Sequence, residues 1–177
     1  TKKFYGPSTL RLGIEKSRNL MTVRLAQYIG MDVVSEYSKR FGINDDMPKI
    51  LSMSLGAGET TLMRLTTAYA MLVNGGKKIQ PSLIDRIQDR RGRTILRHDN
   101  RVCPNCNGIR WANAGNPPMV PDTRVNVIEE QTAYQVVSML EGVVERGTGR
   151  SIRAVGKPLA GKTGTTNDAF DTWFMGF

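Results

Sequence analysis

The sequence predicts a mixed α/β (α+β) fold built around one hydrophobic core. Several segments repeat apolar residues at the helical period of three to four positions. Two short segments near the end of the chain, 157–166 and 172–177, are typical of strands. With 177 residues, of which 40% are hydrophobic, the chain can form one domain or part of one.

The first two predicted helices follow one another directly. Residues 17–29 form an amphipathic pattern with Ser17 near its start and Gly30 at its end. The pattern repeats after Asp32 and ends at Gly42. We therefore expect two short helices in tandem.

Two further helices are expected later in the chain. One begins at Thr60 or Thr61, either of which can cap it, and ends at residues 74–76. The other begins at Glu129 and Glu130, whose charges suit the positive end of a helix, and it ends at Gly147. Its apolar stripe comprises Ala133, Val136, Val137, Leu140, Val143 and Val144.

Between these helices the sequence predicts a hairpin and a loop. Segments 83–88 and 94–97 flank a turn in which Gly92 can adopt a positive φ. Residues 98–126 are rich in Asn, Pro and Gly without periodicity, which is typical of a long surface loop.

The charge pattern argues against several function classes. The net charge is +9, and the one dense basic group is not interleaved with aromatic residues, so nucleic-acid binding is not expected. A solvated face near anionic lipid or wall polymer explains that group better. The sequence has a single histidine, His98, so a Ser-His-Asp triad or a metal site with several histidines is not expected. The basic group comprises Arg86, Arg90, Arg91, Arg93, Arg97 and Arg101.

Two motifs could carry chemistry. Ser17-Arg18-Asn19 stands at a predicted helix start, and Lys162-Thr163-Gly164-Thr165-Thr166 stands on a predicted strand. Ser-x-Asn and Lys-Thr-Gly belong, with Ser-x-x-Lys, to the motif set of penicillin-binding proteins and class A β-lactamases. Taken singly, they also have structural explanations: Ser17 as a helix cap, Asn19 as a first-turn polar residue, and Lys162 with its threonines as an exposed strand edge.

Further stretches fit the same family, and with them nearly the whole chain resembles class A (bifunctional) penicillin-binding proteins of type 1A. Only residues 97–126 resemble nothing specific, and we interpret them as a loop insertion. The stretches are 51–59, Ala68-Tyr69-Ala70 with Asn74-Gly75-Gly76, Gly147-Thr148-Gly149, and 161–168 through Trp173-Phe174.

The resemblance implies that residues 1–177 are the C-terminal part of a transpeptidase domain, with an antiparallel sheet flanked by helices that is incomplete in this chain. The implied activity is D,D-transpeptidation of peptidoglycan stem peptides ending in D-Ala-D-Ala, through a serine acyl-enzyme that β-lactams inhibit. No cofactor is expected. The parent protein would also polymerise glycan from lipid II at the periplasmic face of the bacterial inner membrane.

The resemblance also implies site roles. Ser17 would relay protons, Asn19 would hold a backbone amide of the substrate, and Lys162 would supply positive charge. Gly164 would leave room for the substrate along the strand edge. The backbone N–H of Thr165 would stabilise the oxyanion. Substrate-binding residues would be Thr163, Gly164, Thr165 and Thr166.

The sequence departs from the family in one respect, because no Ser-x-x-Lys motif occurs in it. We expect the attacking serine, a glycosyltransferase domain and any membrane anchor to lie in segments absent from this chain. The chain alone is then predicted to be inactive, and its incomplete sheet could prevent it from folding natively. The alternatives are a serine β-lactamase and a non-catalytic module of the same fold that binds or senses β-lactams.

Cys103 and Cys106 leave several interpretations open. A redox pair should open a helix after a strand, and this pair stands in a loop instead. A zinc site could recruit His98 and Asp99, but a second cysteine pair is missing. A local disulfide and two free thiols both remain.

Overall fold

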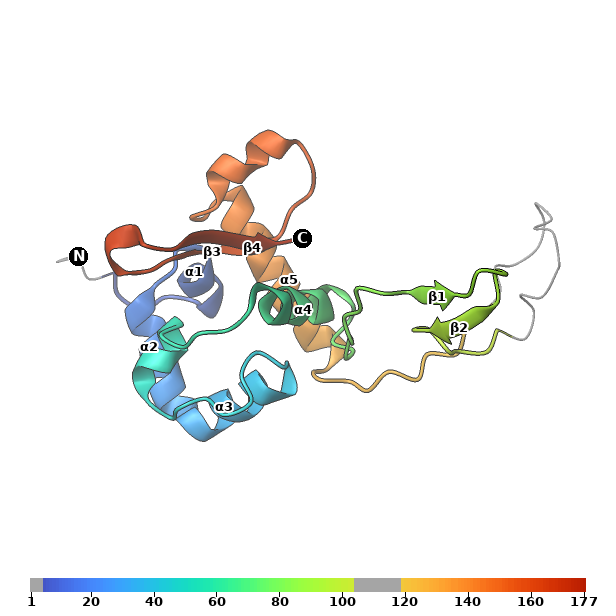
Figure 1. Cartoon of the computed structure of the whole chain (residues 1–177). Coiled ribbons are helices and arrows are strands. Elements are labelled where there is room, and N and C mark those ends of the chain that lie inside the picture. The colour runs from blue at the N-terminus through green and yellow to red at the C-terminus, as the bar shows by residue number, and fades with distance from the viewer. Residues whose placement is uncertain (1–4, 104–118) are drawn as a thin grey trace. The chain divides into compact units, whose positions relative to one another are not determined.

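The computed structural model describes residues 5–103 and 119–177 (Figure 1). They divide into two compact units. The first consists of the described parts of Thr1–Ile79 together with Asn126–Phe177, and the second lies within Gln80–Val125. The motif residues all belong to the first unit, so the site can be described within that unit alone.

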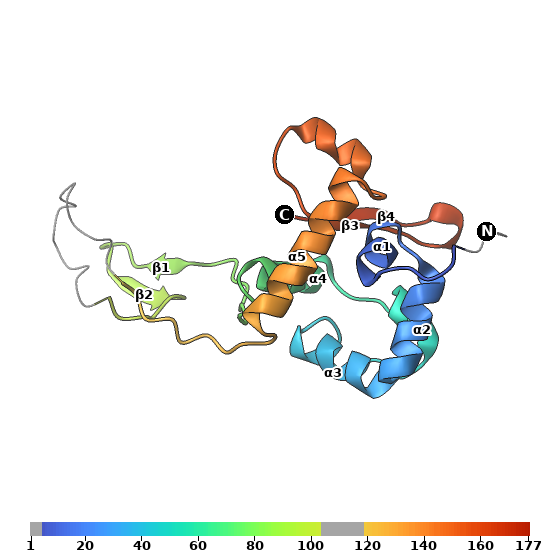
Figure 2. The ribbon, with the colours of Figure 1, turned by 180° about the vertical axis from the view of Figure 1, so that it is seen from behind.

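An antiparallel ribbon of β3 (Gly161–Thr165) and β4 (Thr172–Gly176) forms the sheet of the first unit. Figure 2 shows α5 (Glu130–Glu145) crossing this ribbon with α1 (Leu10–Glu15) beside it. Both α1 and β3 make close contacts with α5. The predicted architecture of helices against an antiparallel sheet is confirmed.

The four predicted helices are present with bounds close to those expected. They are α2 (Asn19–Ile29), α3 (Met31–Arg40), α4 (Leu62–Val73) and α5. Helix α1 and the 3-10 turns η1 (Leu51–Leu55), η2 (Arg150–Val155) and η3 (Asn167–Ala169) were not predicted. Each spans only three to six residues, which is too short for a period to be recognised.

The helix ends correct one sequence interpretation and confirm two. The Thr61 side chain accepts a hydrogen bond from the Arg64 N–H, so Thr61 caps α4. Gly30 ends α2 with φ +89°, a conformation that glycine adopts without steric cost. The N-cap of α2, however, is Arg18, so the interpretation of Ser17 as a mere helix cap is wrong.

The core of the first unit lies between α3, α4 and the chain that leads into α5. Its centre is a cluster of buried residues, and four partly buried hydrophobic residues pack against this cluster. Helix α5 buries the expected face through Ala133, Leu140, Val143 and Val144. The alternation of Trp173 with Phe174 on a strand predicts a core position for Trp173, but this residue is 57% exposed, so that prediction is wrong. The cluster comprises Phe41, Ala68, Met71 and Val127, with Ile43, Leu72, Ile79 and Ile128 packed against it.

The second unit contains the predicted hairpin, formed by β1 (Arg86–Gln88) and β2 (Thr94–Arg97). Gly92 in the turn has φ +77°, as expected. The described residues on either side of 104–118 form no helix or strand before Asn126, in agreement with the predicted loop. Cys106 and Trp111 fall outside the described residues. Among the helices described, none is long and apolar enough to cross a membrane.

Candidate active site

Ser17 and Lys162, which are 145 positions apart in the sequence, meet in the structure. Lys162 is the second residue of β3, and Ser17 lies in the short turn between α1 and α2. The Lys162 Nζ donates hydrogen bonds to the Ser17 Oγ over 2.5 Å and to the Thr163 carbonyl oxygen over 2.9 Å. The two motifs therefore form one constellation.

Ser17 has an unusual backbone conformation. Its φ is +52°, in the left-handed region that a residue with a side chain adopts only at a cost. The turn is closed by hydrogen bonds from the Ser17 N–H to the Ile14 oxygen and from the Arg18 N–H to the Gly13 oxygen. Such conformations cluster at functional sites, where the surroundings hold them.

The environment of Lys162 disfavours its charged form relative to that of a lysine in water. Burial against the sheet lowers the pKa of the Lys162 amine below its usual value, since the charged ammonium loses hydration there. The two hydrogen-bond partners of its amine, the Ser17 Oγ and the Thr163 carbonyl oxygen, are uncharged. A lysine in this state can exchange protons more readily than an ordinary surface lysine.

The threonines of the second motif differ in their partners. The Oγ1 atoms of Thr163 and Thr148 share a hydrogen bond of 2.6 Å. Thr165 is exposed at the end of β3. The Thr166 hydroxyl accepts from the Asp171 N–H over 2.8 Å and thereby closes the turn between the strands. A substrate contact through the Thr166 hydroxyl would have to share or replace that bond.

The outer edge of β3 is available for an extended ligand. Ala160 and Phe177 exchange two backbone hydrogen bonds of 2.9 Å, and pairs that do so alternate with pairs that do not in an antiparallel ladder. By this alternation the backbone groups of Thr163 and Thr165 point away from β4. No described strand pairs with that edge. The Thr165 N–H therefore points toward this unpaired edge of β3.

Asn19 and Gly164 complete the predicted set. Asn19 is exposed at the first position of α2, two residues from Ser17. A Cβ added at Gly164 would meet nothing within 4 Å, so the space beside the strand is open. The structure thus places Asn19 near Ser17 in the chain and leaves room at Gly164.

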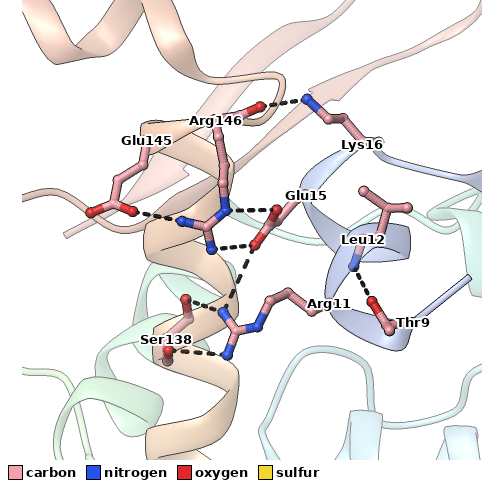
Figure 3. A network of polar contacts seen from close by, with 8 residues as sticks. All are labelled: Thr9, Arg11, Leu12, Glu15, Lys16, Ser138, Glu145 and Arg146. Atoms are coloured by element: carbon pink, nitrogen blue, oxygen red, sulfur yellow. Dashed lines mark hydrogen bonds and ion pairs between the residues drawn. The ribbon is translucent and has the colours of Figure 1, made fainter.

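The sequence analysis missed three residues that hold these segments together: Glu15, Arg146 and Thr148. Glu15 is buried and pairs with Arg146, as Figure 3 shows. Gly147-Thr148-Gly149 contributes to the family resemblance, but the sequence alone assigns it no contact. Glu15 lies in a segment with no motif, so no signal in the sequence could have identified it.

The described residues offer little for a metal ion. Within 5–103 and 119–177 no three His, Cys, Asp or Glu side chains are grouped so as to hold one. Cys103 is disulfide-bonded, so the zinc interpretation of Cys103 is wrong, because a zinc ligand must be a free thiolate. Cys106 lies outside the described range.

The family of the chain follows from comparison with known proteins. A family profile described as "Penicillin binding protein transpeptidase domain" matches residues 1–177. The chain belongs to the penicillin-binding protein transpeptidase domain family. The resemblance drawn from the motifs is therefore confirmed at the level of the family.

Individual relatives of this transpeptidase chain agree with the assignment. Penicillin-binding protein 1A of Rickettsia bellii is 47% identical over 177 residues, which is 99% of this chain and 22% of that protein. The crystal structure of penicillin-binding protein 1A from Haemophilus influenzae superposes with a TM-score of 0.79 at 29% identity, covering 99% of this chain and 29% of that one. The D,D-transpeptidase domain of a peptidoglycan glycosyltransferase from Eggerthella lenta has the same fold, with a TM-score of 0.72 at 22% identity; it covers 99% of this chain and 46% of that one.

The transpeptidase chain spans about a fifth of the length of the curated relatives it matches. The confirmed expectations are the family and the fold class. The roles of individual residues, the reaction and the partners are matters for proposal.

Proposed function

We propose that this chain forms part of a peptidoglycan D,D-transpeptidase that works through a serine acyl-enzyme and is inhibited by β-lactams. The observation that carries the proposal is the 2.5 Å hydrogen bond from Lys162 to Ser17, beside an open strand edge, in a chain of the transpeptidase family. This arrangement offers a proton network and a surface for an extended peptide in one place.

The attacking serine comes from outside residues 1–177 in this proposal. The chain contains no Ser-x-x-Lys motif, and it spans about a fifth of its curated relatives. The serine hydroxyl attacks the carbonyl between the two D-alanines and loses its proton. The C–N bond then breaks, the ester of the acyl-enzyme remains, and the terminal D-alanine leaves as an amine that must gain a proton.

Ser17 relays that proton to the leaving amine. Its hydroxyl gives one proton to the nitrogen and is replenished from the network that Lys162 orders. The lowered pKa of Lys162 favours such exchange, because the energy needed to remove its proton is smaller than for an ordinary lysine. Lys162 also supplies positive charge near the substrate. A second stem peptide then attacks the ester with its amine. The new C–N bond forms, the ester C–O bond breaks, and the proton of the amine returns to the serine oxygen, which completes the cross-link.

The β3 edge binds the substrate in an extended form. The Thr165 N–H stabilises the oxyanion of the tetrahedral intermediate, and Gly164 leaves space for the approaching backbone. Thr163, Thr165 and Thr166 face the terminal carboxylate, with the Thr166 hydroxyl exchanging its bond to Asp171. Asn19 holds a backbone amide of the peptide.

The complete protein extends this activity in the proposal. It polymerises glycan from lipid II through another domain, is anchored in the membrane through a segment outside this chain, and acts at the periplasmic face of the inner membrane. Transpeptidation uses no cofactor and no nucleic acid.

Product analysis of the complete domain distinguishes this function from its alternatives. With a stem-peptide donor and an amine acceptor, we expect release of D-alanine and formation of a cross-linked product, both detected by mass spectrometry. Rapid turnover of a penicillin without cross-linking would indicate a β-lactamase. Stable acylation by the drug without any peptide product would indicate a β-lactam-sensing module.

A further inference from the structure

A polar network joins α1 to the C-terminal end of α5, next to the proposed site (Figure 3). Its centre is Glu15, the last residue of α1, which is only 3% exposed. The Glu15 carboxylate accepts hydrogen bonds from the Arg146 Nη2 over 2.7 Å and from the Arg146 Nε over 3.1 Å. The Arg11 Nη1 lies 3.8 Å from the same carboxylate. A two-point contact between guanidinium and carboxylate fixes both direction and distance.

The backbone of the same segments is joined as well. The Glu15 carbonyl oxygen accepts from the Thr148 N–H over 3.1 Å, and the Lys16 Nζ donates to the Arg146 carbonyl oxygen over 2.5 Å. The two residues before Ser17 are therefore both tied to residues 146–148. We call Glu15, Lys16, Arg146 and the Thr148 N–H the Glu15 clamp.

Two glycines make room for this clamp. A Cβ at Gly142 would lie 2.1 Å from the Glu15 Oε1, and a Cβ at Gly147 would lie 2.3 Å from the Glu15 carbonyl oxygen. Neither contact is possible for real atoms, so α5 and the turn after it can approach Glu15 only because these positions lack side chains. The glycines at positions 142 and 147 thus allow α5 and the turn after it to approach Glu15 closely.

The clamp acts where the site needs support. Ser17 follows it directly, is exposed, and has the left-handed φ of +52°. From this turn its side chain accepts the hydrogen bond of the Lys162 Nζ. On the other side, Thr148 continues from the clamp to the hydroxyl of Thr163 on β3. The clamp therefore touches both halves of the site, although neither Glu15 nor Arg146 contacts Ser17 or Lys162.

We propose that Glu15 and Arg146 are positioning residues that hold Ser17 in hydrogen-bonding contact with Lys162. The inference rests on the proposed function, because it assigns the clamp a purpose only if Ser17 takes part in acylation. Glu15 has no chemical role of its own here, since its two oxygens are occupied by Arg146. Its effect on the reaction passes through the position of the Ser17 hydroxyl.

A double-mutant cycle in the complete protein tests this. The variants are Glu15→Gln, Ser17→Ala and the two combined, and the measurement is the second-order rate of acylation by a fluorescent penicillin. We expect Glu15→Gln to slow acylation roughly 10- to 100-fold in the presence of Ser17, the loss typical of a slightly misplaced reacting group. In the Ser17→Ala background the same change should alter the rate less than about twofold, because there is no relay left to misplace.

Two further variants serve as a second test and as a control. Arg146→Lys keeps the charge but not the two-point contact, and it should show the same dependence on Ser17 if Glu15→Gln does not fold. Asp32→Asn removes an exposed ion pair in which the Lys49 Nζ lies 2.5 Å from the Asp32 Oδ1. This variant should leave the acylation rate unchanged in both backgrounds. Melting temperatures of all variants separate loss of stability from loss of rate.

The outcomes are distinct. An equal loss of rate from Glu15→Gln in both backgrounds, or no loss in either, would overturn the positioning role and leave the proposed function intact. A wild-type rate for Ser17→Ala would remove the relay and with it the positioning role. If the complete wild-type protein is not acylated at all, the proposed function itself fails, and the inference fails with it.

Discussion

At the scale of single residues, the proposed site stands out because one residue has an unusual backbone conformation and another has a shifted pKa. Ser17 has a left-handed backbone, and Lys162 is half-buried with a lowered pKa and neutral partners. Residues that break local rules while their surroundings satisfy them are typical of functional positions. The contact between the two is therefore the feature that mutations should test first.

Replacing Ser17 by Ala should slow acylation of the complete domain by roughly 10²–10⁴-fold, the usual loss for a proton-transfer group. Stability should change little, because the Ser17 side chain is exposed. The measurement is the rate of labelling by a fluorescent penicillin. Ser82→Ala is the matched control: its hydroxyl bonds only to local backbone of the second unit, so the rate should be unchanged. Equal rates for Ser17→Ala and wild type would contradict the relay.

The lowered pKa of Lys162 predicts a pH dependence. A lysine with a lowered pKa loses its proton at a lower pH than the usual value of 10.5. If the ammonium supplies the positive charge, acylation should decline as pH rises through that lowered pKa. In Lys162→Arg this decline should move to higher pH, because a guanidinium keeps its proton up to about pH 12. The measurement is the acylation rate as a function of pH for the wild-type protein and for Lys162→Arg. If the rates of both proteins decline at the same alkaline pH, Lys162 is not the titrating group.

At the scale of elements, the long helices and the hairpin could be predicted from the sequence, whereas the parts that shape the site could not. Helix α5 has sixteen residues and a broad apolar stripe, so its period is readable. Helix α1 has six residues, and its last one, Glu15, is buried by a partner 131 positions away. Ser17 lies outside α2 and two residues after Glu15, and a local pattern carries no information on such a tertiary contact.

The β3 edge gives a paired prediction for two glycines. At Gly164 a Cβ would meet nothing within 4 Å, so Gly164→Ala should fold normally but weaken drug and substrate binding by filling the open space. At Gly161 a Cβ would lie 2.5 Å from the Met175 carbonyl oxygen, so Gly161→Ala should lower the melting temperature. Melting curves and penicillin affinities of the complete domain measure both. A destabilised Gly164→Ala protein with unchanged affinity would contradict the open-edge interpretation.

At the scale of the whole molecule, the sequence predicted the family and fold class because the motifs occur together with matching stretches over most of the chain. The sequence also singled out Ser17 and Lys162, and the structure brings these two residues together. Burial was harder to predict. Trp173 was expected inside but is exposed, and Tyr28 of the α2 stripe is 89% exposed, because hydrophobicity alone does not say which face has a neighbour.

The most direct test of the central claim is the intact mass of the protein after incubation with a penicillin. This chain should be compared with the complete transpeptidase domain and with that domain carrying Lys162→Ala. We predict that the complete domain gains the mass of one drug molecule, that Lys162→Ala gains it far more slowly, and that residues 1–177 alone gain none. A drug adduct on a serine within residues 1–177, or no adduct on the complete domain, would contradict the account.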